Sequence, residues 1–415
     1  MNQIVSLRFG LYQVIFGWMN FVLVVPAIYL LLGLPLIMRE YGWSGTDIGF
    51  FQLAGLPAVF KFLLALPVQR FRVGKRHYSY WSVLLGLLLA ALLYLISDPG
   101  MLAHRVPLFL LSLAINLLST WADIPLNALA VKLLPRSEQM RAGSIRSMAT
   151  FVGAIVGSGL MLVIQGRWGW SAPFYMMASG LLLSLLLMLL LKEDKQNDEL
   201  LPQSDKRPVM MDLVGYFRQP GAKFWIWLLM SSFPFIGAAW LYLKPMLLDL
   251  GVEAQNVAWI VGVGGGIIGA LSSLLSGQFV RYLGVAKAIP TYLFYTFMTL
   301  IILTLTMLFK FSMIWIIVSI FLVAIAMGAM SSLVFGLMMY FTRHKCRASD
   351  YGLQASLFIA TRLTFPICAG IILDAGGYVL MLTVLSLCVL LVFIFTLIFR
   401  AHIKYMMLHT HDGFS

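Results

Sequence analysis

Charged residues are scarce in this chain. Asp, Glu, Lys and Arg make up 11% of its 415 residues, whereas hydrophobic residues make up 61%. Soluble domains carry about a quarter charged residues, so the composition excludes a water-soluble globular fold. The sequence also lacks the alternating polar and apolar stretches of ~10 residues that are typical of membrane β-strands. Helices that span a membrane remain, because they satisfy their own backbone hydrogen bonds.

Metal-binding and redox residues are also rare, with three cysteines and six histidines. Cys346 falls in a predicted loop, whereas Cys368 and Cys388 fall in apolar stretches, so we expect no disulfide framework. His409 and His411 have no third ligand nearby, and we therefore predict no metal site. No cofactor is expected, and a proton gradient would supply the driving force.

The sequence lacks recognisable catalytic patterns. It contains no His-Glu-x-x-His motif, His–Asp constellation or paired carboxylates, and its loops are too short for a catalytic domain. The glycine run 262–269 follows no strand and lacks the Lys-Ser/Thr of a phosphate-binding loop, which favours helix packing. We expect a protein that is not an enzyme. A multipass enzyme acting on lipid or glycan remains an alternative, as does a structural scaffold, although a scaffold would not explain cations retained within the membrane.

The chain does contain twelve apolar stretches, each long enough to cross a bilayer as a helix. Most of its 29 Lys and Arg residues lie in every second loop. Cytoplasmic loops are enriched in these residues, so both termini should be cytoplasmic. The net charge of +13 then reflects topology and contact with membrane lipid, not a nucleic-acid partner. The predicted spans are 12–38, 46–69, 78–97, 107–133, 142–165, 170–191, 222–248, 255–280, 288–309, 312–341, 350–373 and 376–399.

The two halves of the chain repeat one another. Arg141-Ala-Gly143 opens the fifth span and Asp350-Tyr-Gly352 opens the eleventh, at an offset of about 210 residues. Because six spans return the chain to the same side, the halves keep one orientation, as in the major facilitator fold. We predict an all-helical membrane protein of two six-helix bundles (1–191 and 222–400), a cytoplasmic linker (192–221) with a short helix near 210–217, and a cytoplasmic tail (401–415).

Asp123 is the single carboxylate near the middle of any predicted span. Asn116 and Asn127 lie seven residues before it and four after it, so the three share one helix face. A carboxylate within the membrane can carry a proton when its surroundings change. The alternative is a permanent ion pair that fixes the fourth span, with Lys61 or Arg146 as the partner.

Four cations lie inside the predicted spans, where each is costly unless it is paired or faces water. Arg362 is roughly midway along the eleventh span and cannot reach either interface, so it should pair, line a cavity or bind an anion. Lys244 is near the outer end of the seventh span, where extension to the interface is an alternative. Lys61 lies mid-span, and Arg146, one turn into the fifth span, suggests a gating or lipid-facing role.

This excess of cations favours an anionic substrate or an anionic chelate. Aromatic residues within the spans could stack on a flat ligand, although many such residues only mark the membrane interface. The candidates for stacking are Trp18, Tyr29, Trp240, Tyr242 and Tyr340.

Several motifs allow a family resemblance to be named. The stretch from Leu34-Pro35 through Phe60-Lys61-Phe62 to Gln69-Arg70 resembles the first two helices of AmpG-type muropeptide permeases and of the related rhizobactin- and pyochelin-type siderophore permeases. Ala122-Asp123-Ile-Pro-Leu-Asn127 is similar to the fourth helix of that clan. Asp350-Tyr-Gly-Leu-Gln354-Ala-Ser356, with Arg362, is similar to the eleventh.

Two departures from the clan pattern are informative. Gln69 stands where an Asp usually precedes the Arg, which leaves the usual charge-relay gate in doubt. Asn127 stands where the muropeptide branch tends to have a second Asp, and that branch often has extra spans. Both the missing Asp and the compact length favour the siderophore branch.

The resemblance implies a proton-coupled importer of a siderophore or iron–siderophore complex in a bacterial inner membrane, working as a single chain by alternating access. The alternatives are a muropeptide permease and, after it, a drug or metabolite exporter. Asp123 would respond to protons, and Arg70, Lys75 and Arg76 would form a cytoplasmic gate. The predicted substrate contacts are Asn116, Asn127, Arg362, Lys244, Lys61, Trp240 and Tyr29.

Overall fold

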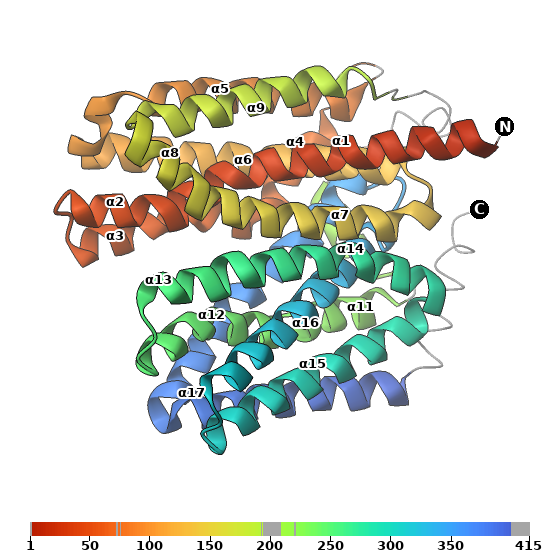
Figure 1. Cartoon of the computed structure of the whole chain (residues 1–415). Helices are drawn as coiled ribbons and strands as arrows, with labels where there is room; N and C mark the ends of the chain where they lie inside the picture. Colours follow the sequence, from red (N-terminus) through yellow and green to blue (C-terminus); the bar gives the residue numbers. More distant parts are fainter. Residues whose placement is uncertain are drawn as a thin grey trace. The chain divides into compact units, whose positions relative to one another are not determined.

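The computed structural model describes residues 2–71, 74, 76–191, 193, 209–219 and 221–399, and these residues form helices without a strand (Figure 1). Eleven helical elements of this part are long and apolar enough to cross a membrane. The last, α17 (Arg347–Ile398), has 52 residues and is interrupted at Gly376 and Gly377. A straight helix of that length would measure about 78 Å against a hydrocarbon core of ~30 Å. It therefore makes two crossings, which brings the total to twelve and confirms the predicted fold class.

Gly377 explains the position of this break. Its φ of 74° lies in the left-handed region, which glycine adopts without the steric cost that a Cβ would impose. The break falls on the first two residues of the predicted twelfth span, 376–399.

The chain divides into two compact units, each dominated by one half of the sequence. Unit 1 comprises Met1–Ala142, Val152–Leu213 and Thr342–Ser356, and unit 2 comprises the remainder. Each half therefore contributes one short segment to the unit built mainly from the other half. These are segment 143–151, in unit 2, and segment 342–356, in unit 1.

The first six spans are formed by α1 to α9, and several consist of more than one element. The second span is a composite because Pro57 lies within a 3₁₀ stretch, Gln52–Phe60, that separates α3 from α4. The helices are α1 (Asn2–Ile28), α2 (Leu34–Glu40), α3 (Gly45–Phe51), α4 (Lys61–Arg70), α5 (His77–Ile96), α6 (Arg105–Leu133), α7 (Arg136–Ile155), α8 (Met161–Trp168) and α9 (Ser171–Met188).

The remaining spans are formed by α11 to α17. The seventh was predicted as one helix but divides at Phe233, because Pro234 has no N–H to continue the ladder. A short helix, α10 (Val209–Tyr216), confirms the helix predicted in the linker. Most of the linker and the whole tail lie outside the described residues. The other helices are α11 (Ala222–Ser232), α12 (Pro234–Asp249), α13 (Ala254–Val257), α14 (Gly265–Leu283), α15 (Val285–Leu308) and α16 (Met313–Tyr340).

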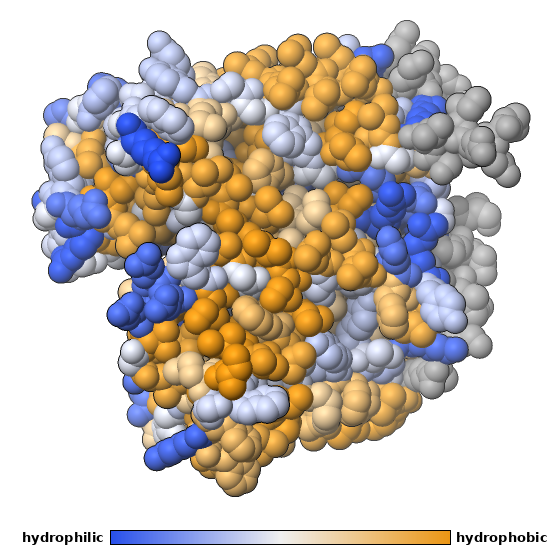
Figure 2. Space-filling view, viewed as in Figure 1, coloured by the Kyte–Doolittle hydropathy of each residue, from blue (hydrophilic) through white to orange (hydrophobic). Residues whose placement is uncertain are grey.

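The outer surface fits a lipid environment. Figure 2 shows apolar side chains over much of the visible face, with hydrophilic ones gathered towards the ends of the helices. Large aliphatic side chains such as Ile367 and Ile371 are 65% and 66% exposed. Exposure of this extent is stable when the solvent is hydrocarbon.

Candidate functional site

Lys61 is positioned by the break in the second span. The 3₁₀ stretch ends at Phe60, and α4 begins at Lys61. This change of helix type lets the Phe62 amide donate to a side chain, Ser356 Oγ, at 2.9 Å. The ammonium of Lys61 is held in the interior of unit 1, with 8% of its side chain exposed.

Asp123 and Lys61 form a buried ion pair. Lys61 Nζ lies 2.5 Å from Asp123 Oδ2, and the Asp123 side chain is 11% exposed. Lys61, one of the partners predicted for a paired Asp123, therefore does pair with it. Removing either member of a buried pair costs about 3–5 kcal/mol because the other charge is left uncompensated.

Asn127 orients the carboxylate. Its Nδ2 donates to Asp123 Oδ1 at 2.8 Å and to the Asp123 carbonyl at 2.7 Å. Asn116 is also buried, and its Nδ2 donates to the Ser112 carbonyl at 2.9 Å. The two amides share the face of Asp123, as the spacing predicted. In this conformation both hydrogen-bond to α6 itself, and their role in substrate binding stays a prediction.

Segment 342–356 reaches this pair through the first turns of α17. Tyr351 is fully buried, and its hydroxyl donates to Asp123 Oδ2 at 3.4 Å. Gly352 permits the close approach, because a Cβ there would lie 2.7 Å from the Ala65 Cβ and 3.0 Å from the Lys61 carbonyl. The motif singled out in the eleventh span thus meets the motifs of the second and fourth spans.

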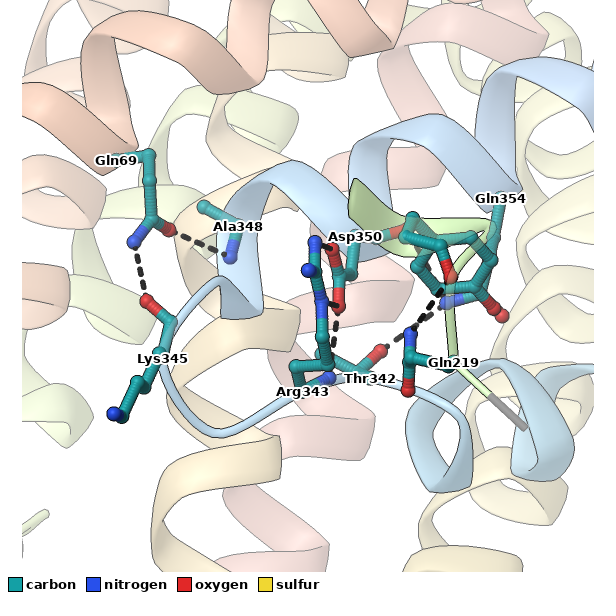
Figure 3. A network of polar contacts seen from close by, with 9 residues as sticks. Gln69, Gln219, Thr342, Arg343, Lys345, Ala348, Asp350 and Gln354 are labelled. Carbon is teal, nitrogen blue, oxygen red and sulfur yellow. Dashed lines mark hydrogen bonds and ion pairs between the residues drawn. The ribbon is translucent and has the colours of Figure 1, made fainter. Parts of the chain in front are cut away.

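A second set of contacts holds the beginning of segment 342–356 (Figure 3). Gln69 Nε2 donates to the Lys345 carbonyl at 2.8 Å, while Gln69 Oε1 accepts from the Ala348 amide at 3.2 Å. Asp350, fully buried, pairs with Arg343 through Nη2–Oδ1 and Nε–Oδ2 contacts of 2.6 and 2.8 Å. The neutral amide of Gln69 therefore makes two contacts where the clan pattern has a carboxylate.

Two of the predicted gate residues, Arg70 and Arg76, do not take part in these contacts. Arg70 ends α4 and Arg76 precedes α5, and both are exposed. Lys75 lies outside the described residues. The gating role of these residues stays a prediction, whereas the neighbouring Gln69 does touch segment 342–356.

His344 adds a titratable group to the same loop. Its Nε2 lies 3.4 Å from Arg136 Nη2, a contact that requires the neutral imidazole as acceptor. Partial burial, followed by the charges of Arg347 and Arg136, lowers the pKa of His344 below its ordinary value. The loop is therefore arranged for an uncharged histidine at neutral pH.

Another buried carboxylate, Glu193, ties three elements of unit 1 together. Its Oε1 lies 3.1 Å from Lys132 Nζ, and its Oε2 accepts from the Ser79 amide and hydroxyl at 3.2 and 2.9 Å. The carboxylate lies at the amino end of α5, where the helix dipole favours negative charge. Sequence inspection missed Glu193 because it lies in a charged run that reads as a linker.

Arg362 differs from the paired cations. It is exposed, yet at 100° per residue it shares a face of α17 with Phe358 and Ala369, which are 4% and 1% exposed. The exposed Ile367 and Ile371 lie on the opposite face. Arg362 therefore points away from the apolar outer face. It makes no hydrogen bond or ion pair with another described residue, so its donors are available to an anion.

The other predicted contact residues lie in different surroundings. Lys244 is exposed on the same face of α12 as Leu241 and Leu248, which are 57% and 47% exposed, and this favours extension to the interface. Trp240 packs against Gly265. Tyr29 is 0% exposed and its hydroxyl bonds to Gln165, so in this conformation it is a packing residue. Ligand contact by these side chains stays a prediction.

Unit 2 holds its exchanged segment, 143–151, in a different way. Ser144 Oγ lies 2.6 Å from Ser332 Oγ, and Ser147 Oγ lies 2.8 Å from the hydroxyls of both Ser273 and Ser331. We call these five residues the serine seam. Gly143 closes it, because a Cβ there would lie 2.2 Å from the backbone nitrogen of Gly336.

Arg146 also belongs to unit 2 and is buried. Its guanidinium carbon lies 4.7 Å from the centre of the Phe335 ring, and 8% of the residue is exposed. This cation–π contact stabilises the charge away from water. The lipid-facing role considered for Arg146 is therefore wrong.

Twelve crossings define a multi-pass membrane protein, and a buried ion pair lies inside them. The sequence pattern of the Major Facilitator Superfamily matches residues 13–360, and the chain belongs to this superfamily. Its members are carriers that bind small molecules and work as single chains. They are generally not enzymes and typically need no cofactor.

Among curated proteins, the anhydromuropeptide permease of Escherichia coli K12 is 26% identical over 258 residues, which cover 58% of this chain and 52% of the permease. The permease of strain O157:H7 matches to the same extent. The match spans about half the length of these relatives.

Solved structures resemble the chain in fold alone. The transporter FucP in its outward conformation is 15% identical with a TM-score of 0.71, over 94% of this chain and 98% of FucP. The human organic anion transporter MFSD10 is 13% identical with a TM-score of 0.72, over 92% and 99%. A bacterial homologue of the iron transporter ferroportin is 15% identical with a TM-score of 0.68, over 93% and 98%.

Proposed function

We propose that this protein is a proton-driven importer in a bacterial inner membrane and that its substrate is a muropeptide-like sugar–peptide. The substrate class follows the curated relatives, which are named anhydromuropeptide permeases. This was the alternative that the sequence motifs left open. Siderophore import, which the motifs favoured, gains no support from the comparisons.

The observation that carries the proposal is the Lys61–Asp123 pair with Tyr351 against it. Two buried charges stay inside a membrane protein when they attract each other. A proton on Asp123 removes that attraction and changes the acceptor that Tyr351 uses. Protonation therefore weakens the hold of unit 1 on segment 342–356. A conformational change follows when a bound proton favours one state over the other.

Arg362 supports an anionic substrate. Its planar guanidinium offers paired donors that match a carboxylate, and muropeptides carry carboxylates on their peptide. A siderophore chelate is also commonly anionic, so Arg362 alone does not separate the two substrate classes.

A transport assay separates them. The purified protein would be reconstituted in liposomes, and uptake of a radiolabelled anhydromuropeptide and of an iron–siderophore complex would be compared with and without an inward proton gradient. We expect gradient-stimulated uptake of the first only. Uptake of the siderophore complex alone would restore the siderophore hypothesis and overturn this one.

Asp123→Asn tests the proton role in the same liposomes. The amide is nearly isosteric but carries neither the charge nor the exchangeable proton, so stimulation by the gradient should disappear. Asp98→Asn is the matched control, because Asp98 caps a turn outside the spans through the Gly100 amide. Wild-type stimulation in Asp123→Asn would exclude Asp123 as the coupling residue.

A further inference from the structure

A polar stripe runs along one face of α6. It comprises Ser112, Asn116, Ser119, Asp123 and Asn127, whose spacing of three and four residues places them within an arc of about 80° at 100° per residue. All five are buried, with at most 8% of any residue exposed. The stripe extends over about 22 Å at 1.5 Å per residue.

Three polar atoms of this stripe have no hydrogen-bond partner in the described part of the chain: Ser112 Oγ, Ser119 Oγ and Asn127 Oδ1. Atoms of this kind occur elsewhere, for example at Ser232 and Thr296, but no other described helix carries three on one face. A buried polar atom without a partner costs about 1–3 kcal/mol. Such atoms are usually satisfied by ordered water.

Other buried serines in the protein show how a hydroxyl is satisfied without water. Ser184, also fully buried, donates to the Gly180 carbonyl of its own helix at 2.7 Å, and Ser386 does the same with Leu382 at 2.6 Å. The serine seam satisfies its hydroxyls mutually. The hydroxyls of Ser112 and Ser119 do neither, although both belong to a regular helix.

The stripe leads from the outer end of α6 to the ion pair. Arg105, at the start of α6, lies on the same face and pairs with Asp47 at 2.7 Å, with 58% of the Arg105 side chain exposed. Inward along this face come Ser112, Asn116 and Ser119, and then Asp123. At the inner end, Lys61 and Tyr351 contact the Asp123 carboxylate.

We propose that the α6 stripe holds a file of water molecules that carries protons from the outer side to Asp123. This rests on the proposed proton coupling and adds its route. In each step a water or serine oxygen accepts one proton and passes on another, and the last proton binds an oxygen of the Asp123 carboxylate. No other reactant is consumed.

Removing the hydroxyls tests the route. Ser112→Ala/Ser119→Ala should slow gradient-driven uptake of anhydromuropeptide by roughly threefold to tenfold, because each hydrogen bond in the file contributes about 0.5–1.5 kcal/mol. Counterflow at equal pH, which needs no net proton movement, should keep its wild-type rate. Ser119→Thr should restore driven uptake, and Ser184→Ala, the dry control, should change neither rate.

Hydration is measured separately from transport. In a protein whose three cysteines are replaced, the Ser119→Cys thiol should react with a small methanethiosulfonate about tenfold faster than the Ser184→Cys thiol, because only a hydrated thiol forms the reactive thiolate. Equal rates would overturn the proposal whatever the protein transports. Loss of coupling in Asp123→Asn with undiminished driven uptake in the double serine variant would overturn the route while leaving the proposed function intact.

Discussion

Segments 342–356 and 143–151 occupy equivalent places in the two sequence halves, yet different chemistry holds each in its unit. Gly143 and Gly352 are separated by the same number of residues as Ser147 and Ser356. In unit 1 the segment meets an ion pair, a tyrosine hydroxyl and a glutamine amide. In unit 2 it meets serine hydroxyls and a glycine backbone. The first set contains an ionisable carboxylate, whereas the second consists of hydroxyls and backbone, so the proposed proton coupling predicts that unit 1 is the proton-sensitive unit.

The largest expected effect comes from breaking the ion pair. Lys61→Met should lower the free energy of unfolding by about 3–5 kcal/mol, because the buried Asp123 carboxylate loses the charge of Lys61. Thermal unfolding in detergent measures this loss. The double variant Lys61→Met/Asp123→Leu should regain most of the stability but not the gradient-driven uptake. If the double variant were as unstable as the single one, the pair would not be the cause.

The two glycines should respond unequally. Gly143→Ala forces the backbone of Gly336 to move, since the new Cβ would lie 2.2 Å from its nitrogen, whereas Gly352→Ala mainly meets the Ala65 methyl at 2.7 Å. We expect Gly143→Ala to lower the free energy of unfolding by about 1–3 kcal/mol and Gly352→Ala to lower it less, as measured by thermal unfolding. Gly166→Ala is the control, because nothing lies within 4 Å of its added methyl. Equal losses of stability in Gly143→Ala and Gly352→Ala would argue against a tighter contact in unit 2.

Gln69 provides a milder test of the first segment. Gln69→Glu keeps an acceptor for the Ala348 amide but sets a carboxylate against the Lys345 carbonyl. The free energy that holds the loop against residue 69 should therefore fall by about 1 kcal/mol, the net value of one hydrogen bond. Faster trypsin cleavage after Arg343 and Lys345 reports this release. Ser147→Ala, in unit 2, should leave that cleavage rate unchanged. An effect of the same size from Ser147→Ala would mean that the two segments are not held independently.

The smallest effect should come from His344. Its pKa is lowered in the folded protein, so the unfolded chain takes up this proton first. Docking of segment 342–356 is then fully stable above the ordinary histidine pKa of about 6.5 and weakens as the pH falls below it. The same trypsin assay at pH 7.5 and 5.5 measures the change, and His344→Gln should reduce the pH dependence. A loop that is equally protected at both values in the wild type would contradict this prediction.

The fold was largely predictable from the chain. Apolar runs of membrane length and the alternation of basic loops indicated twelve helices and cytoplasmic termini, because lipid leaves the backbone few other structures. The break inside α17 was predicted between residues 373 and 376, close to Gly376 and Gly377. The division of the seventh span at Phe233 was missed, although Pro234 was visible as its signal.

The site was predictable in part. Helical periodicity alone placed Asn116, Asp123 and Asn127 on one face, and the same spacing would have found Ser112 and Ser119. Periodicity could not identify Lys61 as a partner of Asp123, since the two residues are 62 positions apart in sequence. Nor could it show that Tyr29 is packed away while Arg362 remains accessible.

Composition and spacing decided which helices form, how many times the chain crosses and which residues share a helix face, because these properties depend on transfer into lipid and on the 3.6-residue turn. Tertiary packing decided which charges neutralise each other and that segment 342–356 lies against Asp123. Those outcomes depend on distances of a few ångströms between residues separated by as many as 228 positions, which no local pattern encodes.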